Sequence, residues 1–318
     1  MNIIETKNLT KSYGSFTAVS NVNLHIRKGT VYGFLGPNGA GKSTTMNMVT
    51  GYLGATSGEV KINGFDILKQ PEEAKKCIGY LPEIPPLYVD MTVKEYLDFA
   101  AELKEIDRAD RRQYVDEAME MTKITDMKDR LIKNLSKGYR QRVGLAQAVL
   151  GYPEVIILDE PTVGLDPKQI IEMRELIKKL GEKHTVILSS HILSEVREVC
   201  DYIFIISKGK LVANDTTENL LEKVEKNHRE LEILLRGDAE AASGLLKQVD
   251  FIEEIETAEG KEEDTTLLKV KTAADTDIRN QIIKILVEAN VELLEIRSAG
   301  KSLEDIFLEL TEQKGELL

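Results

Sequence analysis

The stretch GFLGPNGAGKSTTMNMVTG, residues 33–51, decides the fold of this 318-residue chain. Its centre, GPNGAGKST, satisfies the pattern G-x-x-x-x-G-K-[ST] and lies between a strand-like segment and a helix-like segment. Glycines in such a loop let backbone N–H groups turn toward phosphate oxygens, and the helix N-terminus adds partial positive charge. We therefore predict a phosphate-binding loop formed by Gly36, Pro37, Asn38, Gly39, Ala40, Gly41, Lys42, Ser43 and Thr44.

Within this loop, Lys42 is predicted to reach the β- and γ-phosphates, and Ser43 to offer its hydroxyl to Mg²⁺. A second motif, VIILDE, follows about 120 residues later and ends an apolar strand in two carboxylates. Ligands of α/β sheets bind at the carboxyl ends of strands. We predict that Asp159 holds Mg²⁺ and that Glu160 takes a proton from the attacking water. Alone, the motif also fits a strand that ends in an acidic turn.

A third motif, LSKGYRQRVGLAQAVL, covers residues 135–150. Ser136 and Gly138 lie just before a predicted helix, so the same argument from the helix N-terminus gives a second anion site. The local sequence fits a serine N-cap of an ordinary helix equally well.

The remaining pattern indicates an α/β fold with two domains, at 1–220 and 221–318. Several strand candidates before residue 220 are almost wholly apolar, as in a parallel sheet buried on both faces. The segment YIFIISKGKLVAND is one of the strand candidates. Apolar residues at helical spacing predict a helical subdomain at about 85–155. The second domain shows the order βαββαβ, which predicts a small α+β ferredoxin-like fold, and then a final helix at 302–313.

Charge supports this division. Residues 1–219 carry 30 acidic and 29 basic side chains, whereas residues 220–318 carry 24 acidic and 13 basic ones. The net charge of −12 disfavours nucleic acid as a partner, because phosphate recognition needs a basic surface. No apolar stretch reaches the roughly 20 residues of a membrane-spanning helix. Two isolated cysteines indicate a reducing compartment, and the four histidines show no zinc-site spacing.

Taken together, GPNGAGKST, LSKGY, VIILDEP, VGLDP and SSH resemble the ATP-binding subunit of an ABC transporter over about residues 2–220. The resemblance implies a phosphate-loop NTPase core with antiparallel β and helical subdomains, binding ATP and Mg²⁺. In that family two ATP-binding domains face each other head to tail. By similarity, Ser136 and Gly138 contact the γ-phosphate held by the opposite subunit, and Asp166 lies at the dimer interface. His191 then contacts the γ-phosphate, and Tyr13 stacks on adenine.

Two positions depart from the family pattern. Lys137 and Tyr139 interrupt the usual LSGGQ, while Ser136 and Gly138 keep their places. Glu83 stands where the family usually has glutamine, at a position that helps to bind Mg²⁺ and senses the membrane partner. A carboxylate is a suitable Mg²⁺ ligand, so we expect Glu83 to keep the metal role.

The closing segment SLEDIFLELT resembles the C-terminal extension of ATPases that serve ABC-2 type exporters, including drug, sodium and gliding-motility subgroups. This resemblance implies an ATP-hydrolysing subunit at the cytoplasmic face of the membrane. Its partners would be an integral-membrane permease, contacted near residues 84–100, and a second ATP-binding subunit. The alternative is a soluble ABC ATPase that acts as a regulatory switch or in translation or repair. A phosphate-loop kinase or GTPase is disfavoured by LSKGY and SSH and by the lack of NKxD.

Overall fold

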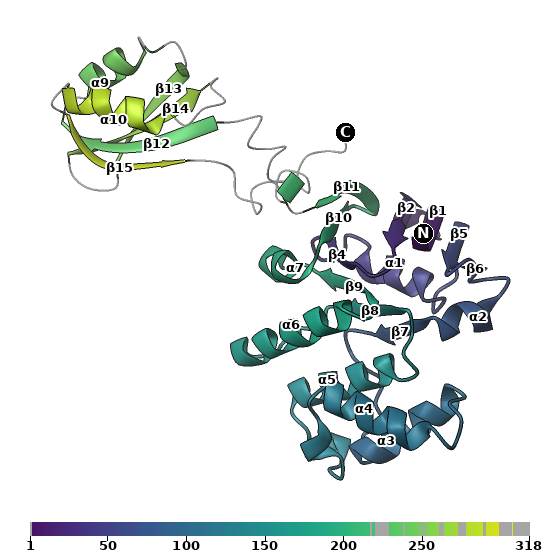
Figure 1. Cartoon of the computed structure of the whole chain (residues 1–318). Helices are drawn as coiled ribbons and strands as arrows, with labels where there is room; N and C mark the ends of the chain where they lie inside the picture. Colours follow the sequence, from purple (N-terminus) through teal and green to yellow (C-terminus); the bar gives the residue numbers. More distant parts are fainter. Residues whose placement is uncertain are drawn as a thin grey trace. The chain divides into compact units, whose positions relative to one another are not determined.

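A six-stranded sheet organises the first part of the chain in this computed structural model (Figure 1). Its strands lie in the order β11-β10-β4-β9-β8-β7, and all except β11 run parallel to their neighbours. Every residue of β4, β8 and β9 is buried, which explains the apolar runs VYGFL, VIIL and VIL in these strands. The strands are β4 (Val31–Leu35), β7 (Ile78–Leu81), β8 (Val155–Asp159), β9 (Thr185–Ser190), β10 (Tyr202–Ser207) and β11 (Lys210–Thr216).

The structure describes residues 2–216, 218–219, 229–237, 239–247, 249, 252–260, 264–272, 278–288, 291–298 and 307. These residues divide into two units, which lie within Met1–Thr217 and Glu218–Leu308. In the described part of the chain, no helix is long and apolar enough to cross a membrane.

One strand prediction needs correction. The segment YIFIISKGKLVAND is not a single strand but the hairpin β10–β11. The chain reverses at Lys208 and Gly209, whose φ angles are 48° and 76°. Positive φ at both central residues is typical of the tight turn that joins antiparallel strands, and glycine adopts it without strain.

A second, five-stranded antiparallel sheet lies against the first. Its strands are β1 (Asn2–Tyr13), β2 (Phe16–Val22), β3 (His25–Arg27), β5 (Ser57–Ile62) and β6 (Phe65–Asp66). One hydrophobic core joins this sheet, helix α1 (Lys42–Val49) and the six-stranded sheet; its members include Ile4, Met46 and Phe204. The helix that follows the glycine-rich loop is therefore anchored on two sheets.

A helical region leaves the sheet after β7 and returns at β8, although these two strands pair directly (Figure 1). It consists of α3 (Val93–Leu103), α4 (Arg111–Met121), η1 (Thr125–Met127), η2 (Ile132–Asn134) and α5 (Lys137–Val149). Helix α3 begins with a capping box, in which Glu95 N–H donates to the Thr92 hydroxyl and Thr92 N–H to the Glu95 carboxylate. The apolar periodicity predicted these three α-helices. It did not predict α2 (Pro71–Lys76), α6 (Pro167–Gly181) or α7 (Leu193–Val199).

The second unit confirms the predicted ferredoxin-like fold. Its four antiparallel strands lie in the order β13-β14-β12-β15, and alternate residues of β12 are buried against α9 and α10. The elements are β12 (Arg229–Arg236), α9 (Ala239–Leu246), β13 (Ile252–Glu259), β14 (Thr265–Thr272), α10 (Arg279–Glu288) and β15 (Glu292–Ser298). The helix predicted at 302–313 lies, except for Phe307, outside the described residues.

Because each unit has its own core, we predict that residues 1–217 fold when they are expressed alone. Differential scanning calorimetry of this fragment should show one cooperative transition. Residues 218–318 alone should melt at a lower temperature, since small cores give marginal stability. An insoluble 1–217 fragment without a cooperative transition would contradict the proposed domain boundary.

Candidate functional site

The glycine-rich loop connects β4 to α1, and close backbone approach fixes its shape. Gly41 has a φ of 105°, and a Cβ at this position would lie 2.8 Å from the carbonyl oxygen of Ala18. A Cβ at Gly36 would lie 2.5 Å from the carbonyl oxygen of Ile206. These positions exclude larger residues, and so the pattern predicted from the sequence has a steric cause.

Lys42 is nearly buried, with 6% of its surface exposed, and its ammonium turns back over the loop. The Nζ donates to the carbonyl oxygens of Gly36 at 2.8 Å and Pro37 at 3.3 Å. It also forms an ion pair of 3.2 Å with Oε1 of Glu160. The lysine is therefore held in place by its own loop and by the residue after β8.

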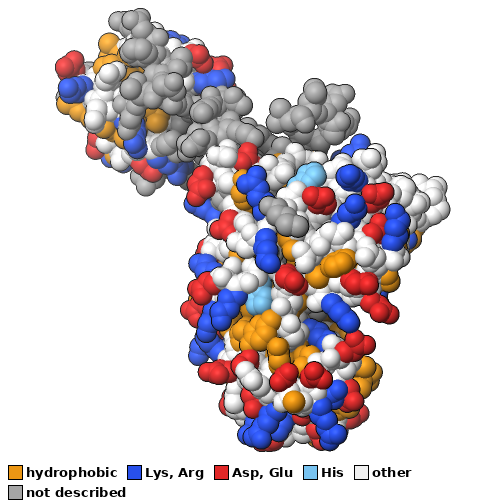
Figure 2. Space-filling view, turned by 45° about the vertical axis from the view of Figure 1, so that its right-hand side comes forward, with side chains coloured by type: hydrophobic (Ala, Val, Ile, Leu, Met, Phe, Trp, Pro, Cys, Tyr) orange, Lys and Arg blue, Asp and Glu red, His pale blue; other side chains and the backbone are white. Residues whose placement is uncertain are grey.

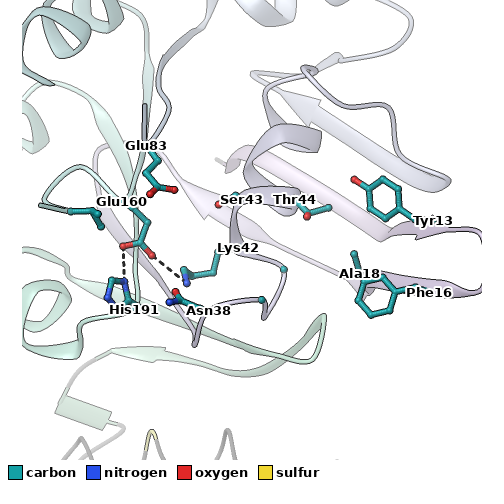
Figure 3. Close-up of a pocket in the computed structure, with 13 residues that line it drawn as sticks. Tyr13, Phe16, Ala18, Asn38, Lys42, Ser43, Thr44, Glu83, Glu160 and His191 are labelled. Atoms are coloured by element: carbon teal, nitrogen blue, oxygen red, sulfur yellow. Dashed lines mark hydrogen bonds and ion pairs between the residues drawn. The ribbon is translucent and has the colours of Figure 1, made fainter. Parts of the chain in front are cut away.

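Glu160 links the lysine to His191. Its Oε2 lies 2.9 Å from Nδ1 of His191, directly beyond β9, so each carboxylate oxygen has its own partner (Figure 3). Since a carboxylate only accepts, Nδ1 carries the proton in this contact. Glu160 has a φ of 48°, a left-handed conformation that costs a non-glycine residue of order 1–3 kcal/mol. Such strain at a buried carboxylate is typical of functional sites.

Asp159 lies behind this group and is 3% exposed. One of its carboxylate oxygens accepts a hydrogen bond from the Ser189 hydroxyl, which in turn accepts from the backbone N–H of Glu160 at 3.1 Å. Ser189, which the sequence analysis did not single out, thus joins both carboxylate residues to β9. Nearby, Tyr80 donates to Asn47 of α1 at 2.9 Å; burial, and then the charge of Asp159, raises the pKa of Tyr80 and keeps it neutral.

A pocket of about 540 Å³ opens beside these residues. Two aromatic side chains, Tyr13 and Phe16, lie at one end, and Glu160 and His191 lie at the other, with the loop between them (Figure 3). Phe16 was not predicted, because a strand-initial phenylalanine carries no motif. The lining residues are Tyr13, Phe16, Ala18, Asn38, Gly39, Gly41, Lys42, Ser43, Thr44, Glu83, Glu160, Val163 and His191.

Ser136, Gly138 and Asp166 do not line this pocket. Ser136 caps α5, and its hydroxyl accepts from Tyr139 N–H at 3.4 Å. Asp166 caps α6 and accepts from Gln169 N–H at 2.9 Å. A Cβ at Gly138 would lie 2.6 Å from the Gln169 side chain, so the starts of α5 and α6 pack tightly together. The three residues therefore belong to a second group around two helix N-termini, with Ser136 and Asp166 exposed.

The oxygen donors fit a magnesium ion bound together with phosphates. Ser43 and Glu83 line the pocket, whereas Asp159, which directly precedes the lining residue Glu160, is buried and does not line it. Among the described residues, no group of three or more His, Cys, Asp or Glu side chains could hold a metal alone. Mg²⁺ does not need such a group, because it usually binds one or two protein oxygens and takes its other ligands from phosphate and water.

Comparisons with known proteins agree with this arrangement. Residues 19–163 match the family model described as "ABC transporter". The chain is 36% identical to the bacitracin transport ATP-binding protein BcrA of Bacillus licheniformis, with 97% of each chain covered. It is 30% identical to the linearmycin resistance ATP-binding protein LnrL of Bacillus subtilis, covering 97% of this chain and 98% of that one.

Solved structures give the same result. One, titled as the ATP binding subunit of an ABC transporter, superposes with a TM-score of 0.64 at 29% identity over 70% of this chain and 92% of that chain. Another is a dimeric ATP-binding cassette bound to ADP and phosphate, with a TM-score of 0.62 at 28% identity over 67% of this chain and 98% of that chain.

Proposed function

Because the chain belongs to the ATP-binding subunits of ABC transporters, we propose that it hydrolyses ATP at sites shared by two subunits to drive an export permease. The observation that carries the proposal is the chain of contacts from Lys42 through Glu160 to His191. It combines a buried cation inside a phosphate loop with a carboxylate suited to accept a proton.

The pocket suits ATP at both ends. Tyr13 and Phe16 are 51% and 65% exposed, so either ring is accessible for stacking on adenine. Backbone N–H groups of the loop and the start of α1 face the phosphates. Mg²⁺, when bound through Ser43 and the carboxylates, supplies charge that neutralises the phosphate oxygens.

Glu160 is paired with Lys42 in the structure. The phosphates of ATP compete for the Lys42 ammonium, and this competition releases Oε1 of Glu160. The freed carboxylate then accepts a proton from water as that water attacks the γ-phosphorus. The bond from the γ-phosphorus to the bridging oxygen breaks, leaving ADP and phosphate. His191 keeps hold of the second carboxylate oxygen and so fixes the direction of the base.

A second subunit completes the site in this proposal. Ser136 is exposed at the start of α5, with Gly138 buried two residues further on, and neither lines the pocket of its own chain. A head-to-tail partner can bring that positive helix end, with the Ser136 hydroxyl, to the γ-phosphate. Asp166, at the neighbouring helix start, then lies at the interface. The solved dimeric cassette with ADP and phosphate supports this arrangement.

The permease contact is proposed next to Glu83. Ile84, Tyr88 and Val89 follow this residue within six positions and are 80%, 58% and 43% exposed, and exposed apolar side chains that lie close together are typical of an interaction surface. The relatives named for bacitracin transport and linearmycin resistance support export. A subunit that drives a permease in this way would lie at the cytoplasmic face of the membrane.

The alternative is a regulatory or translation and repair ATPase without a permease. On the face shown in Figure 2, basic and acidic side chains are interspersed over the described surface rather than gathered into one basic stripe. Recovery of an integral-membrane permease with the tagged chain after detergent extraction separates the two functions, because the alternative requires none.

Glu160→Gln should keep ATP binding and reduce turnover by roughly 10²- to 10⁴-fold, because the amide keeps the shape but cannot accept the proton. ATP affinity should not fall, since the ion pair that competes for Lys42 is gone. Steady-state ATPase assays and nucleotide binding measure these two effects, and size-exclusion chromatography should show an ATP-stabilised dimer. Turnover close to that of the unmodified chain would remove Glu160 from this role.

Glu83→Gln should stay active but need more Mg²⁺ for half-maximal ATPase activity. The Glu83 carboxylate lines the same pocket as Glu160, so its charge is unfavourable there without metal and favourable with it. Glu83→Ala should need still more Mg²⁺, because no side-chain oxygen remains. If Mg²⁺ titrations of all three proteins coincide, Glu83 does not touch the metal in the working state.

A further inference from the structure

Glu195, on α7, is a buried carboxylate to which neither the motifs nor the comparisons assign a role. Its side chain is 3% exposed, and in the described part of the chain it makes no ion pair within 4.0 Å. One oxygen, Oε2, accepts from the hydroxyl of Thr162 at 2.6 Å and from that of Ser190 at 3.2 Å. Burying a carboxylate without a cation is costly, and two hydroxyl donors offset part of that cost.

These hydrogen bonds join the two segments that carry the Glu160–His191 contact. Thr162 lies two residues beyond Glu160, inside the turn closed by the bond from Val163 N–H to the Glu160 carbonyl. Ser190 directly precedes His191 and also accepts from the N–H of Ile192 at 3.0 Å, so the residues on both sides of the histidine are fixed.

The two serines at the end of β9 bind different partners. Ser189 holds Asp159 and the backbone of Glu160, while Ser190 holds Glu195. Successive residues of a strand point to opposite faces of the sheet. Ser189 therefore holds the end of β8 on one face, and Ser190, through Glu195, holds the turn after β8 on the other face. The turn begins with Glu160 in its strained conformation, which persists only where the surroundings enforce it.

We propose that Glu195 is a positioning residue that sets the geometry between Glu160 and His191 through Thr162 and Ser190. It does not touch substrate. The inference rests on the proposed roles of Glu160 and His191. Its consequence is that removal of the shared acceptor loosens the base and the histidine together, without altering the phosphate loop.

The test uses the full-length chain and the variants Glu195→Leu, Thr162→Val and Thr162→Ser. Glu195→Leu removes the acceptor and Thr162→Val removes a donor, and each should lower kcat about tenfold or more, as loss of a supporting hydrogen bond does at other sites, with little change in KM for ATP. Thr162→Ser keeps the donor and should recover most of the kcat that Thr162→Val loses. Glu198→Leu is the matched control, because it changes an exposed carboxylate one turn further along the same helix.

A merely structural role would lower the melting temperature and ATP affinity together with kcat, so both are measured for every variant. Thr162→Val and Glu195→Leu combined should lose no more kcat than the worse single variant. In a His191→Ala background, Glu195→Leu should add little, since the contact that Glu195 positions is already absent. Full kcat in Thr162→Val or Glu195→Leu, or losses that add fully to those of His191→Ala, would overturn the inference. If Glu160→Gln itself keeps its turnover, the proposed function fails instead, whatever the result at Glu195.

Discussion

One buried carboxylate governs this site. Glu160 gives one oxygen to Lys42 and the other to His191, with Lys42 and Glu160 both almost fully shielded from water. Removing either partner of such a pair leaves an uncompensated charge in a mostly buried position. Phosphate is a natural replacement for the carboxylate at Lys42, because it carries the same sign of charge. In the proposed function, nucleotide binding and activation of the base are therefore one event.

The sheet explains why residues so far apart in sequence can meet. In the order β4-β9-β8, three adjacent parallel strands end at the same edge. The phosphate loop follows β4, Glu160 follows β8 and His191 follows β9. Each of these side chains therefore lies directly after a strand end, close to the other two. Ligands of open α/β sheets bind at this edge for the same reason. The antiparallel sheet adds the aromatic end of the pocket through Tyr13 and Phe16.

Much of the fold and of the candidate site could be predicted from the sequence, because short motifs and the spacing of apolar residues determine them. GPNGAGKST predicted the loop, the apolar strands predicted the buried sheet, and the alternating periods after residue 220 predicted the order βαββαβ. The hairpin at Lys208 was missed because its turn requires a lysine with positive φ, which composition does not indicate. Ser189, Thr162 and Glu195 were missed because their hydrogen bonds cross between loops, and no periodicity records such contacts. The roles of Ser136 and Asp166 need a second subunit, so one chain leaves them as predictions.

In the proposed function, each ATP site takes its phosphate loop from one subunit and its Ser136 helix start from the other. This arrangement can be tested with two heterodimers of differently tagged chains that carry the same two substitutions. When Lys42→Ala and Ser136→Arg lie on different chains, one complete site remains, and we predict ATP hydrolysis. When both lie on one chain beside an unmodified partner, neither site is complete, and we predict no hydrolysis. Hydrolysis by the second heterodimer, at the rate expected of its unmodified chain acting alone, would contradict the shared site.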